Sequence, residues 1–335
     1  MRLRHLALPV LLLAACGREA TEPKEPQDRL AAEIGGCTAK GCQPAAQALR
    51  DGRRLLALKR FTTTKMDLAT QEYLRGRSAG QRRDMAAFEA EWTRMGGVLR
   101  DGIGAPSPAA FEGVEPALVR AIGEAALLQT RGYYQASLDQ GRNTSPREGL
   151  LYLGNAYAQR EIAELCRRLA EPMSQAPPPV RALDPDLDAL QAEMLAAYRP
   201  PASVDKHSWF INASSLLKEA RELNAAGLRY GALLRYLQSA QLLAPLLPDP
   251  PALDAGTFAQ RLRELDSRLS VGDVDHSLGR MFLEAAQAEP EGSPTAAVIV
   301  NYVLPRYFAA LGPAPSAAPK PAPQVTVTLV RWPYT

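Results

Sequence analysis

The fold class is decided by residues 150–169, which read LLYLGNAYAQREIAELCRRL. Small and apolar residues recur there every three or four positions, and the repeat is carried by Leu151, Gly154, Ala158, Ile162, Leu165 and Leu169. An α-helix has 3.6 residues per turn, so residues with this spacing form one apolar stripe along its surface. The stretch therefore predicts an amphipathic helix that buries the stripe against a neighbour.

The same periodicity recurs along the chain and predicts an all-α fold of about ten helices packed as stacked hairpins. We expect the helical domain to span residues 30–312, with a candidate subdivision at 172–184, and no strand between about 65 and 312. Pro305 should kink or split the apolar helix 296–311. Ser145 and Ser293 each precede a proline, as N-caps do. Further stripes are carried by Met85, Phe88, Trp92 and Met95, by Leu118, Ile122, Ala125 and Leu128, by Leu187, Leu190, Met194 and Ala197, by Leu216, Ala220 and Leu223, by Leu233, Leu237 and Ala240, and by Phe258, Leu262, Leu265 and Leu269.

The C-terminus departs from the helical pattern. Residues 313–324 are mostly proline and alanine, which predicts a semi-rigid extended linker. Residues 325–335 begin with alternating β-branched residues and predict a short β-strand. This strand either joins a sheet of a partner protein through Val325, Val327, Leu329 and Trp332 or folds back beside the segment 60–64.

The N-terminus carries a basic start, Arg2 and Arg4, followed by an apolar stretch of about ten residues that ends in Leu13-Ala14-Ala15-Cys16. This stretch is shorter than the roughly 20 residues that span a bilayer. The segment resembles the signal of bacterial lipoproteins, known as the lipobox. The resemblance implies that residues 1–15 are removed, that Cys16 is lipidated, and that residues 16–29 form a flexible tether. Several acyl chains on Cys16 would make the bilayer attachment durable.

The lipobox resemblance also implies a location in the cell envelope. In that family an Asp after the lipidated cysteine retains the protein at the inner membrane. Gly17 stands there, which implies the outer membrane of a Gram-negative bacterium. Removing Arg2 and Arg4 lowers the formal net charge from +3 to +1, and no dense Lys/Arg tract follows. A near-neutral chain of this kind argues against nucleic acid as a partner.

Two segments resemble tetratricopeptide repeats. The first carries Leu150, Leu153, Gly154 and Tyr157, with Leu where these repeats usually have Trp. The second carries Leu223, Gly227, Tyr230, Ala232 and Tyr236, followed by Pro245. The period of about 34 residues typical of the family does not join them. The resemblance implies helical hairpins that stack, in a tetratricopeptide-like or irregular superhelix.

Four cysteines are present, and Cys16 is assigned to the lipid. We favour a disulfide between Cys37 and Cys42, which lie close in a glycine-containing segment of a chain expected outside the cytosol. A bridge from either to Cys166, or a metal site, is the alternative. Cys166 follows Leu165 on a helical apolar face and is otherwise interpreted as a buried thiol.

His207 and His276 are the histidines of the chain after the signal segment, and each follows an aspartate, Asp205 or Asp275. Both sites are interpreted as helix starts capped by the aspartate. If the two starts meet, the four side chains could bind a metal or another ligand. Independent first-turn residues are the interpretation we favour.

The chain shows no convincing catalytic constellation. Gly76-Arg77-Ser78-Ala79-Gly80 matches the Gly-x-Ser-x-Gly motif of serine hydrolases, but its surroundings predict a loop between helices. Peptidoglycan-cleaving lytic transglycosylases typically have Ser after the catalytic Glu, and no Glu-Ser pair occurs here. The sequence therefore favours a non-enzymatic scaffold or adaptor without a cofactor, which binds other envelope proteins. A ligand- or metal-binding lipoprotein is the alternative, and a peptidoglycan-acting enzyme is a weaker one.

Overall fold

The computed structural model describes residues 28–171, 175–201, 203–247, 253–272, 274–290 and 292–312. These residues are predominantly helical, which confirms the all-α prediction, and their only β-pairings are two isolated bridges. Nine of their α-helices have twelve or more residues, namely α3, α5 and α7–α13. The predicted signal peptide, linker and C-terminal strand, and nearly all of the tether, lie outside the described residues.

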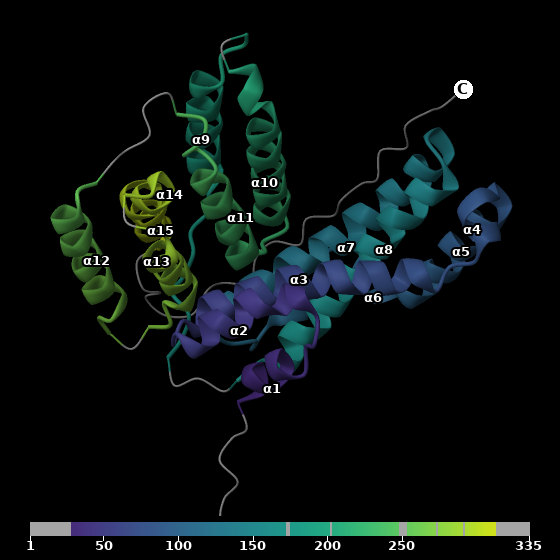
Figure 1. Ribbon diagram of the computed structural model, residues 1–335, viewed down its shortest axis with the longest axis horizontal. Helices are drawn as coiled ribbons and strands as arrows, with labels where there is room; N and C mark the ends of the chain where they lie inside the picture. Colours follow the sequence, from purple (N-terminus) through teal and green to yellow (C-terminus); the bar gives the residue numbers. More distant parts are fainter. Residues whose placement is uncertain are drawn as a thin grey trace, which may run out of the picture.

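A long antiparallel hairpin forms the spine of the fold and consists of α7 (Ala117–Asn143) and α8 (Pro146–Arg168). Ser145 caps α8 as predicted, because its side chain accepts a hydrogen bond of 3.3 Å from the backbone N–H of Glu148. In Figure 1 the two helices run side by side toward the end of the molecule where α4 and α5 lie. The α7–α8 pair thus sets the length of this half of the molecule.

Helix α3 (Arg54–Arg75) packs along α8 and replaces one sequence prediction. Residues 60–64, beside which the C-terminal strand was considered to fold back, lie inside this helix. Their three consecutive threonines favour strands locally, but Phe61 and Thr62 are buried in the helical core. The close approach of α3 to α8 needs a glycine at position 154 of α8, since a Cβ there would lie 3.0 Å from the Tyr73 ring of α3.

Shorter helices complete the N-terminal half. They are α1 (Arg29–Gly35), α2 (Gln43–Arg50), α4 (Ala79–Arg83), α5 (Met85–Val98) and α6 (Arg100–Ile103), with 3-10 turns at Lys40–Cys42 and Pro108–Phe111. Phe88 and Met95 of α5 are buried as their spacing predicted, and Met85 and Trp92 pack against them half-buried.

The C-terminal half adds α9 (Asp184–Ala197), a 3-10 turn (Val204–Lys206), α10 (His207–Ala225), α11 (Arg229–Gln241), α12 (Ala255–Leu269), α13 (Ser277–Ala288), α14 (Pro294–Val298) and α15 (Leu304–Ala310). Helices α10 and α11 form a second hairpin, and α11 packs on α7. In Figure 1, α12 to α15 lie to the left of this hairpin. Ser293 caps α14 as predicted.

Pro305 splits the last helical run as predicted. Residues Ile299–Val303 form a π-turn between α14 and α15, and Pro305 occupies the first turn of α15. Proline has no N–H to donate, so a regular helix would lose a bond there, and the wider π-turn lies immediately before this interruption.

One large apolar core joins most of these helices, and it includes residues on both sides of 172–184. A smaller, separate core lies at the far end of the α7–α8 hairpin and consists of Tyr73, Phe88, Met95, Leu99, Tyr134, Leu150, Leu153 and Ala156. No helix in the described part of the chain is both long and apolar enough to span a bilayer.

Candidate partner-binding surface

The structure gives His207 a tyrosine partner at the end of the α9–α10 hairpin. Its Nδ1 lies 2.8 Å from the Tyr198 hydroxyl, and the Tyr198 ring stacks on Phe210 with centroids 4.3 Å apart. Asp205 does not cap α10, contrary to the prediction. It lies inside the 3-10 turn that precedes the helix, and α10 begins without a side-chain cap.

His276 has a different tyrosine partner, because its Nδ1 lies 2.9 Å from the Tyr307 hydroxyl. Burial lowers the pKa of His276 below its ordinary value. Asp275 is buried and binds two backbone N–H groups, one of Ser277 at 2.9 Å and one of Ala117 at the start of α7. This aspartate therefore fastens the start of α13 to the start of α7.

The described residues contain no group of three or more His, Cys, Asp or Glu side chains that could hold a metal ion. The predicted set of His207, His276, Asp205 and Asp275 is therefore not assembled into one site in this part of the molecule. The resemblance between the two sequences extends instead to a hydrogen bond between each histidine and a tyrosine of its own.

Cys37 and Cys42 form a disulfide that closes the loop between α1 and α2. Cys166 is a free, buried thiol, and burial raises its pKa to about 12. A thiol of this kind is a packing residue rather than a nucleophile. Cys16 and the predicted contact residues Val325, Val327, Leu329 and Trp332 lie outside the described residues.

The Gly-x-Ser-x-Gly motif lies between α3 and α4, as the helix pattern predicted. The Ser78 hydroxyl accepts a hydrogen bond from the backbone N–H of Gln81, and the Gln81 side chain accepts one from the backbone N–H of Ser78. This reciprocal pair is a capping box. The serine therefore begins a helix and has no strand beneath it, which a hydrolase elbow requires.

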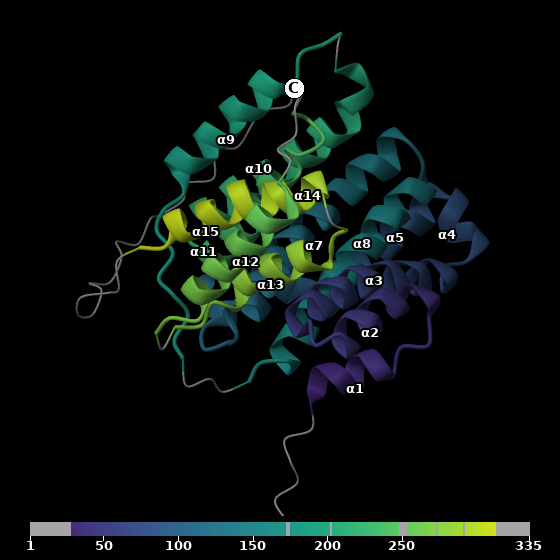
Figure 2. The same ribbon diagram turned by 60° about the vertical axis from the view of Figure 1, so that its left-hand side comes forward.

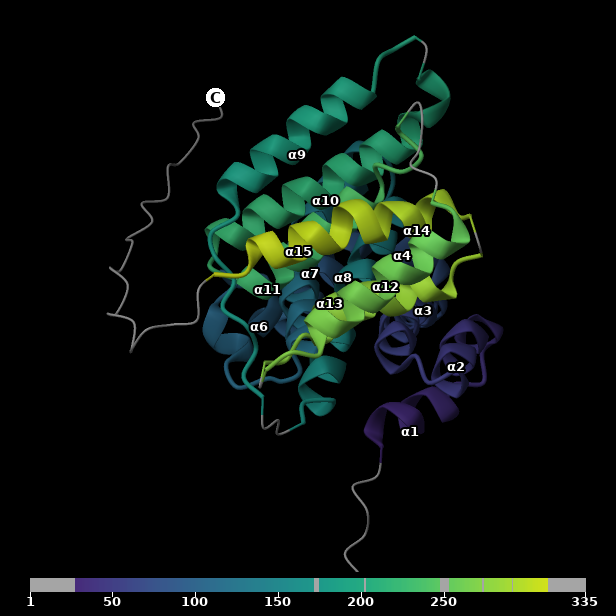
Figure 3. The same cartoon turned by 90° about the vertical axis from the view of Figure 1, so that its left-hand side faces the viewer.

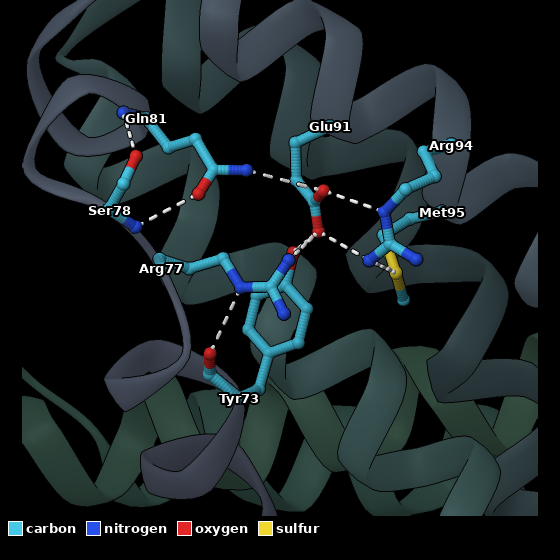
Figure 4. Close-up of polar contacts among 7 residues, drawn as sticks. All are labelled: Tyr73, Arg77, Ser78, Gln81, Glu91, Arg94 and Met95. Atoms are coloured by element: carbon cyan, nitrogen blue, oxygen red, sulfur yellow. Dashed lines mark hydrogen bonds and ion pairs between the residues drawn. The ribbon is translucent and has the colours of Figure 1, made fainter.

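A buried carboxylate next to this motif was not predicted from the sequence (Figure 4). Glu91 accepts hydrogen bonds from the Tyr73 hydroxyl at 2.8 Å and from Arg94 at 2.7 and 2.8 Å, and it pairs with Arg77. Burial alone would raise the pKa of Glu91, but its bonds to Arg94 and Tyr73 and the charge of Arg77 outweigh burial and lower the pKa. An ionised carboxylate with both oxygens occupied is a poor general acid, so Glu91 serves to join α5 to α3.

The clearest unexplained feature is an apolar groove beside the start of α10. We define the Trp209 groove as the hollow of about 540 Å³ lined by Lys206, Trp209, Gln241, Leu242, Ala244, Pro245, Leu247, Pro294 and Thr295. Trp209 is 45% exposed within it. The charged side chain in the groove lining is Lys206, and its ammonium group donates a hydrogen bond of 3.2 Å to the Leu247 carbonyl. Most of the lining is therefore apolar surface that faces water.

Further apolar side chains are exposed around the end of the α9–α10 hairpin, namely Leu195 at 55%, Val204 at 64% and Ile211 at 47%. Large exposed apolar surfaces on a folded protein commonly mark contacts with a partner. The connection between α9 and α10 lies at the top of Figures 1 to 3, and α1 lies at the bottom. The exposed end of the hairpin therefore points away from the N-terminal helix.

The sequence held a signal for this surface. Trp209, Phe210 and Ile211 are three consecutive large apolar residues, and one face of a helix cannot bury all three. Phe210 faces inward against Tyr198, whereas Trp209 and Ile211 stay exposed.

A second surface is basic rather than apolar. Arg75, Arg82, Arg83 and Arg147 are exposed around a groove of about 640 Å³ between α3, α4 and α8, with Glu148 among them. Exposed arginines are well solvated, so this groove needs no partner to explain it. The exposed tryptophan of the other groove does call for a partner, because water contact with its apolar ring is unfavourable.

Comparisons with known proteins provide no family for this chain. No protein-family model matches it, no curated protein matches its sequence, and no solved structure matches its fold.

Proposed function

We propose that this protein is a lipid-anchored helical adaptor of the bacterial envelope that binds a partner protein through the Trp209 groove. The exposure of Trp209 in an apolar groove is the observation that carries the proposal. Aromatic residues surrounded by apolar lining commonly dominate the affinity of protein interfaces. The partner would therefore contribute an uncharged, apolar segment that covers the Trp209 ring.

The direction of the groove favours a protein partner over the anchoring membrane. The proposed anchor, Cys16, precedes α1 by only twelve residues. Helix α1 and the α9–α10 connection lie at opposite ends of the molecule in each view. An anchored molecule of this shape would present the groove away from its own bilayer, which we propose to be the outer membrane of a Gram-negative cell.

The proposed architecture is a set of stacked hairpins similar to tetratricopeptide repeats. The α7–α8 and α10–α11 pairs support it, because α11 packs on α7 and thus places one hairpin against the other. Residues 325–335 would add a second contact by joining a strand of the partner through Val325, Val327, Leu329 and Trp332.

Photo-crosslinking in living cells tests the proposal. A photoreactive phenylalanine analogue replaces Trp209 in the full-length, anchored protein, and adducts are identified by mass spectrometry. The same substitution at Val271, which is also exposed but lies outside the groove, is the matched control. We expect one specific adduct at Trp209 that is absent at Val271.

The captured protein is then purified, and its affinity is measured for the wild-type chain and for Trp209→Ser and Val271→Ser variants. Loss of a buried aromatic anchor should weaken binding by about 2 kcal/mol or more, while Val271→Ser has no effect. Equal affinity of all three proteins would contradict the proposed groove. A truncation before Val325 then tells whether the tail contributes.

A further inference from the structure

A cavity of about 240 Å³ lies where α3, α7, α8 and α11 meet, away from the Trp209 groove. Its floor consists of buried apolar side chains, among them Leu118, Ile122, Ala126 and Ile162. Thr63 is exposed and lies at the rim. The cavity is thus a hollow that opens to water on one side and has an apolar interior.

Two cations line this apolar hollow, Lys59 from α3 and Arg235 from α11. The Lys59 ammonium forms no ion pair or hydrogen bond with any described residue. The charges that act on it most are those of Arg235 and Arg60, which are both positive. A partly buried ammonium without a counter-ion is costly, and such groups in proteins are normally paired.

Arg235 is also incompletely satisfied. Its Nε lies 2.9 Å from a Glu219 carboxylate oxygen but, although buried, has no hydrogen bond of acceptable geometry in the described structure. Its Nη1 donates to Gln238 at 2.9 Å. The Glu219 carboxylate also accepts hydrogen bonds of 3.0 Å from the side-chain amide of Gln129. One buried N–H donor next to the cavity is therefore ion-paired with Glu219 but makes no well-aligned hydrogen bond.

The charges at the cavity determine the class of ligand that fits. Glu219 offsets the charge of Arg235, which leaves Lys59 as the one cation of the cavity lining without a counter-charge, and Arg60 adds further positive charge nearby. One added negative charge would balance Lys59 within the lining, whereas a dianion would bring a second negative charge toward Glu219. The floor side chains offer no donor or acceptor, so the part of the ligand that lies against them should be hydrocarbon. Elsewhere on the cavity wall lie polar side chains, among them Thr62, Gln129, Tyr133, Gln159 and Gln238.

We propose that this cavity binds a small organic monoanion, namely a carboxylate with a short apolar chain, whose charged end is held by Lys59 and Arg235. The apolar chain lies against Ile122, Ala126 and Ile162. A carboxylate accepts charge-assisted hydrogen bonds from both cations, which are stronger than bonds between neutral groups. The site is separate from the Trp209 groove, and the two proposals can fail independently.

Saturation-transfer NMR on the full-length protein in detergent tests this site, with empty micelles as the blank. The probes are butanoate, its neutral isostere butanamide, and inorganic phosphate. We expect saturable binding of butanoate and at least roughly tenfold weaker binding of butanamide and phosphate. Equal binding of butanoate and butanamide, tighter binding of phosphate, or no binding of butanoate would overturn the proposal.

Lys59→Met tests the role of the cation, and Lys218→Met is the matched control on the exposed face of α10. We expect Lys59→Met to weaken butanoate binding at least roughly tenfold and Lys218→Met to leave it unchanged. Lys59→Met should also raise the melting temperature of the ligand-free protein, which shows that the variant is folded. Unchanged affinity in a folded Lys59→Met protein would refute the assignment. Ala126→Leu, which fills the floor, should weaken binding without any change in charge.

Discussion

The carboxylate of Glu124 on α7 accepts a 2.7 Å hydrogen bond from the backbone N–H of Gly231 on α11. Glu124 is fully buried and also pairs with Arg120 one turn earlier, at 2.8 Å. This contact fixes how closely the two helical hairpins approach. A Cβ at Gly231 would lie 2.9 Å from the Glu124 Cβ and 3.1 Å from the backbone nitrogen of Ala125.

Gly231→Ala is therefore expected to destabilise the protein. The added methyl group meets backbone and a short side-chain stem, which cannot rotate away, so we expect a loss of about 1–3 kcal/mol in the free energy of unfolding. Gly132→Ala is the matched control, because nothing lies within 4 Å of the position of its Cβ. It should gain up to about 1 kcal/mol from the helix propensity of alanine. Urea denaturation measures both, and a stable Gly231→Ala protein would show that α7 and α11 can separate without cost.

A second prediction concerns the pH dependence of stability that Glu124 causes. Burial raises the pKa of Glu124 above its ordinary value, although Arg120 and the Gly231 N–H act in the opposite direction. The folded state therefore holds the proton more tightly than the unfolded chain, and the contribution of Glu124 to stability falls as pH rises from about 4.3 through the folded pKa. Glu124→Gln should lose this dependence. Denaturation at a series of pH values would show the difference between wild type and variant, which exposed Glu112→Gln should not reproduce.

A third prediction concerns Lys59, whose effect on the pH dependence of stability has the opposite sign. Burial and the positive charges of Arg235 and Arg60 lower the pKa of Lys59. Besides the two cations, the cavity is lined by one titratable group, Tyr133, and by uncharged polar side chains, namely Thr62, Thr63, Gln129, Gln159 and Gln238. The unfolded chain holds the Lys59 proton more tightly, so stability rises with pH from the folded pKa up to about 10.4. Lys59→Met should remove this rise. A variant whose stability follows the wild-type pH curve would place the ammonium in water.

The proposed anchor makes a fourth prediction, which concerns residues outside the described structure. Cys16→Ala should abolish incorporation of a clickable palmitate analogue and block removal of residues 1–15. Gly17→Asp should keep the lipid but move the protein from outer-membrane to inner-membrane fractions on a density gradient. Palmitate labelling of the Cys16→Ala protein would exclude Cys16 as the modified residue, and an unmoved Gly17→Asp protein would contradict outer-membrane sorting.

Local sequence rules predicted the helices well because each depends on nearby residues. The buried stripe from Gly154 to Leu169, the caps Ser145 and Ser293, and the break near Pro305 all involve neighbours within a few positions. Leu151, which was predicted on the same stripe, is exposed instead. Asp205 was wrongly predicted as a cap because the 3-10 turn that displaces it belongs to the connection between α9 and α10. Residues 60–64 were considered as a neighbour for the C-terminal strand, but they are helical because burial against α8 outweighs the local preference of threonine.

The candidate sites depend on contacts across long sequence separations, which a periodic pattern does not specify. Lys59 and Arg235 lie 176 positions apart and line one cavity only because α11 packs on α7 beside α3. Glu91 resembles a solvated helix residue in the sequence, yet Tyr73 and Arg77 of a different segment enclose it. The run from Trp209 to Ile211 was the one local sign of an exposed apolar surface.

The separate small core at the end of the α7–α8 hairpin has a consequence for motion. Because Phe88, Met95 and Leu150 belong to a cluster separate from the main core, we expect that end of the molecule to open as its own cooperative unit. It can open while the main body stays folded, and its backbone amides would then exchange hydrogen with water sooner than those of α11. The Trp209 groove and the lining of the Lys59 cavity other than Tyr133 lie outside that small core, so both proposed binding sites would persist while the distal end opens and closes.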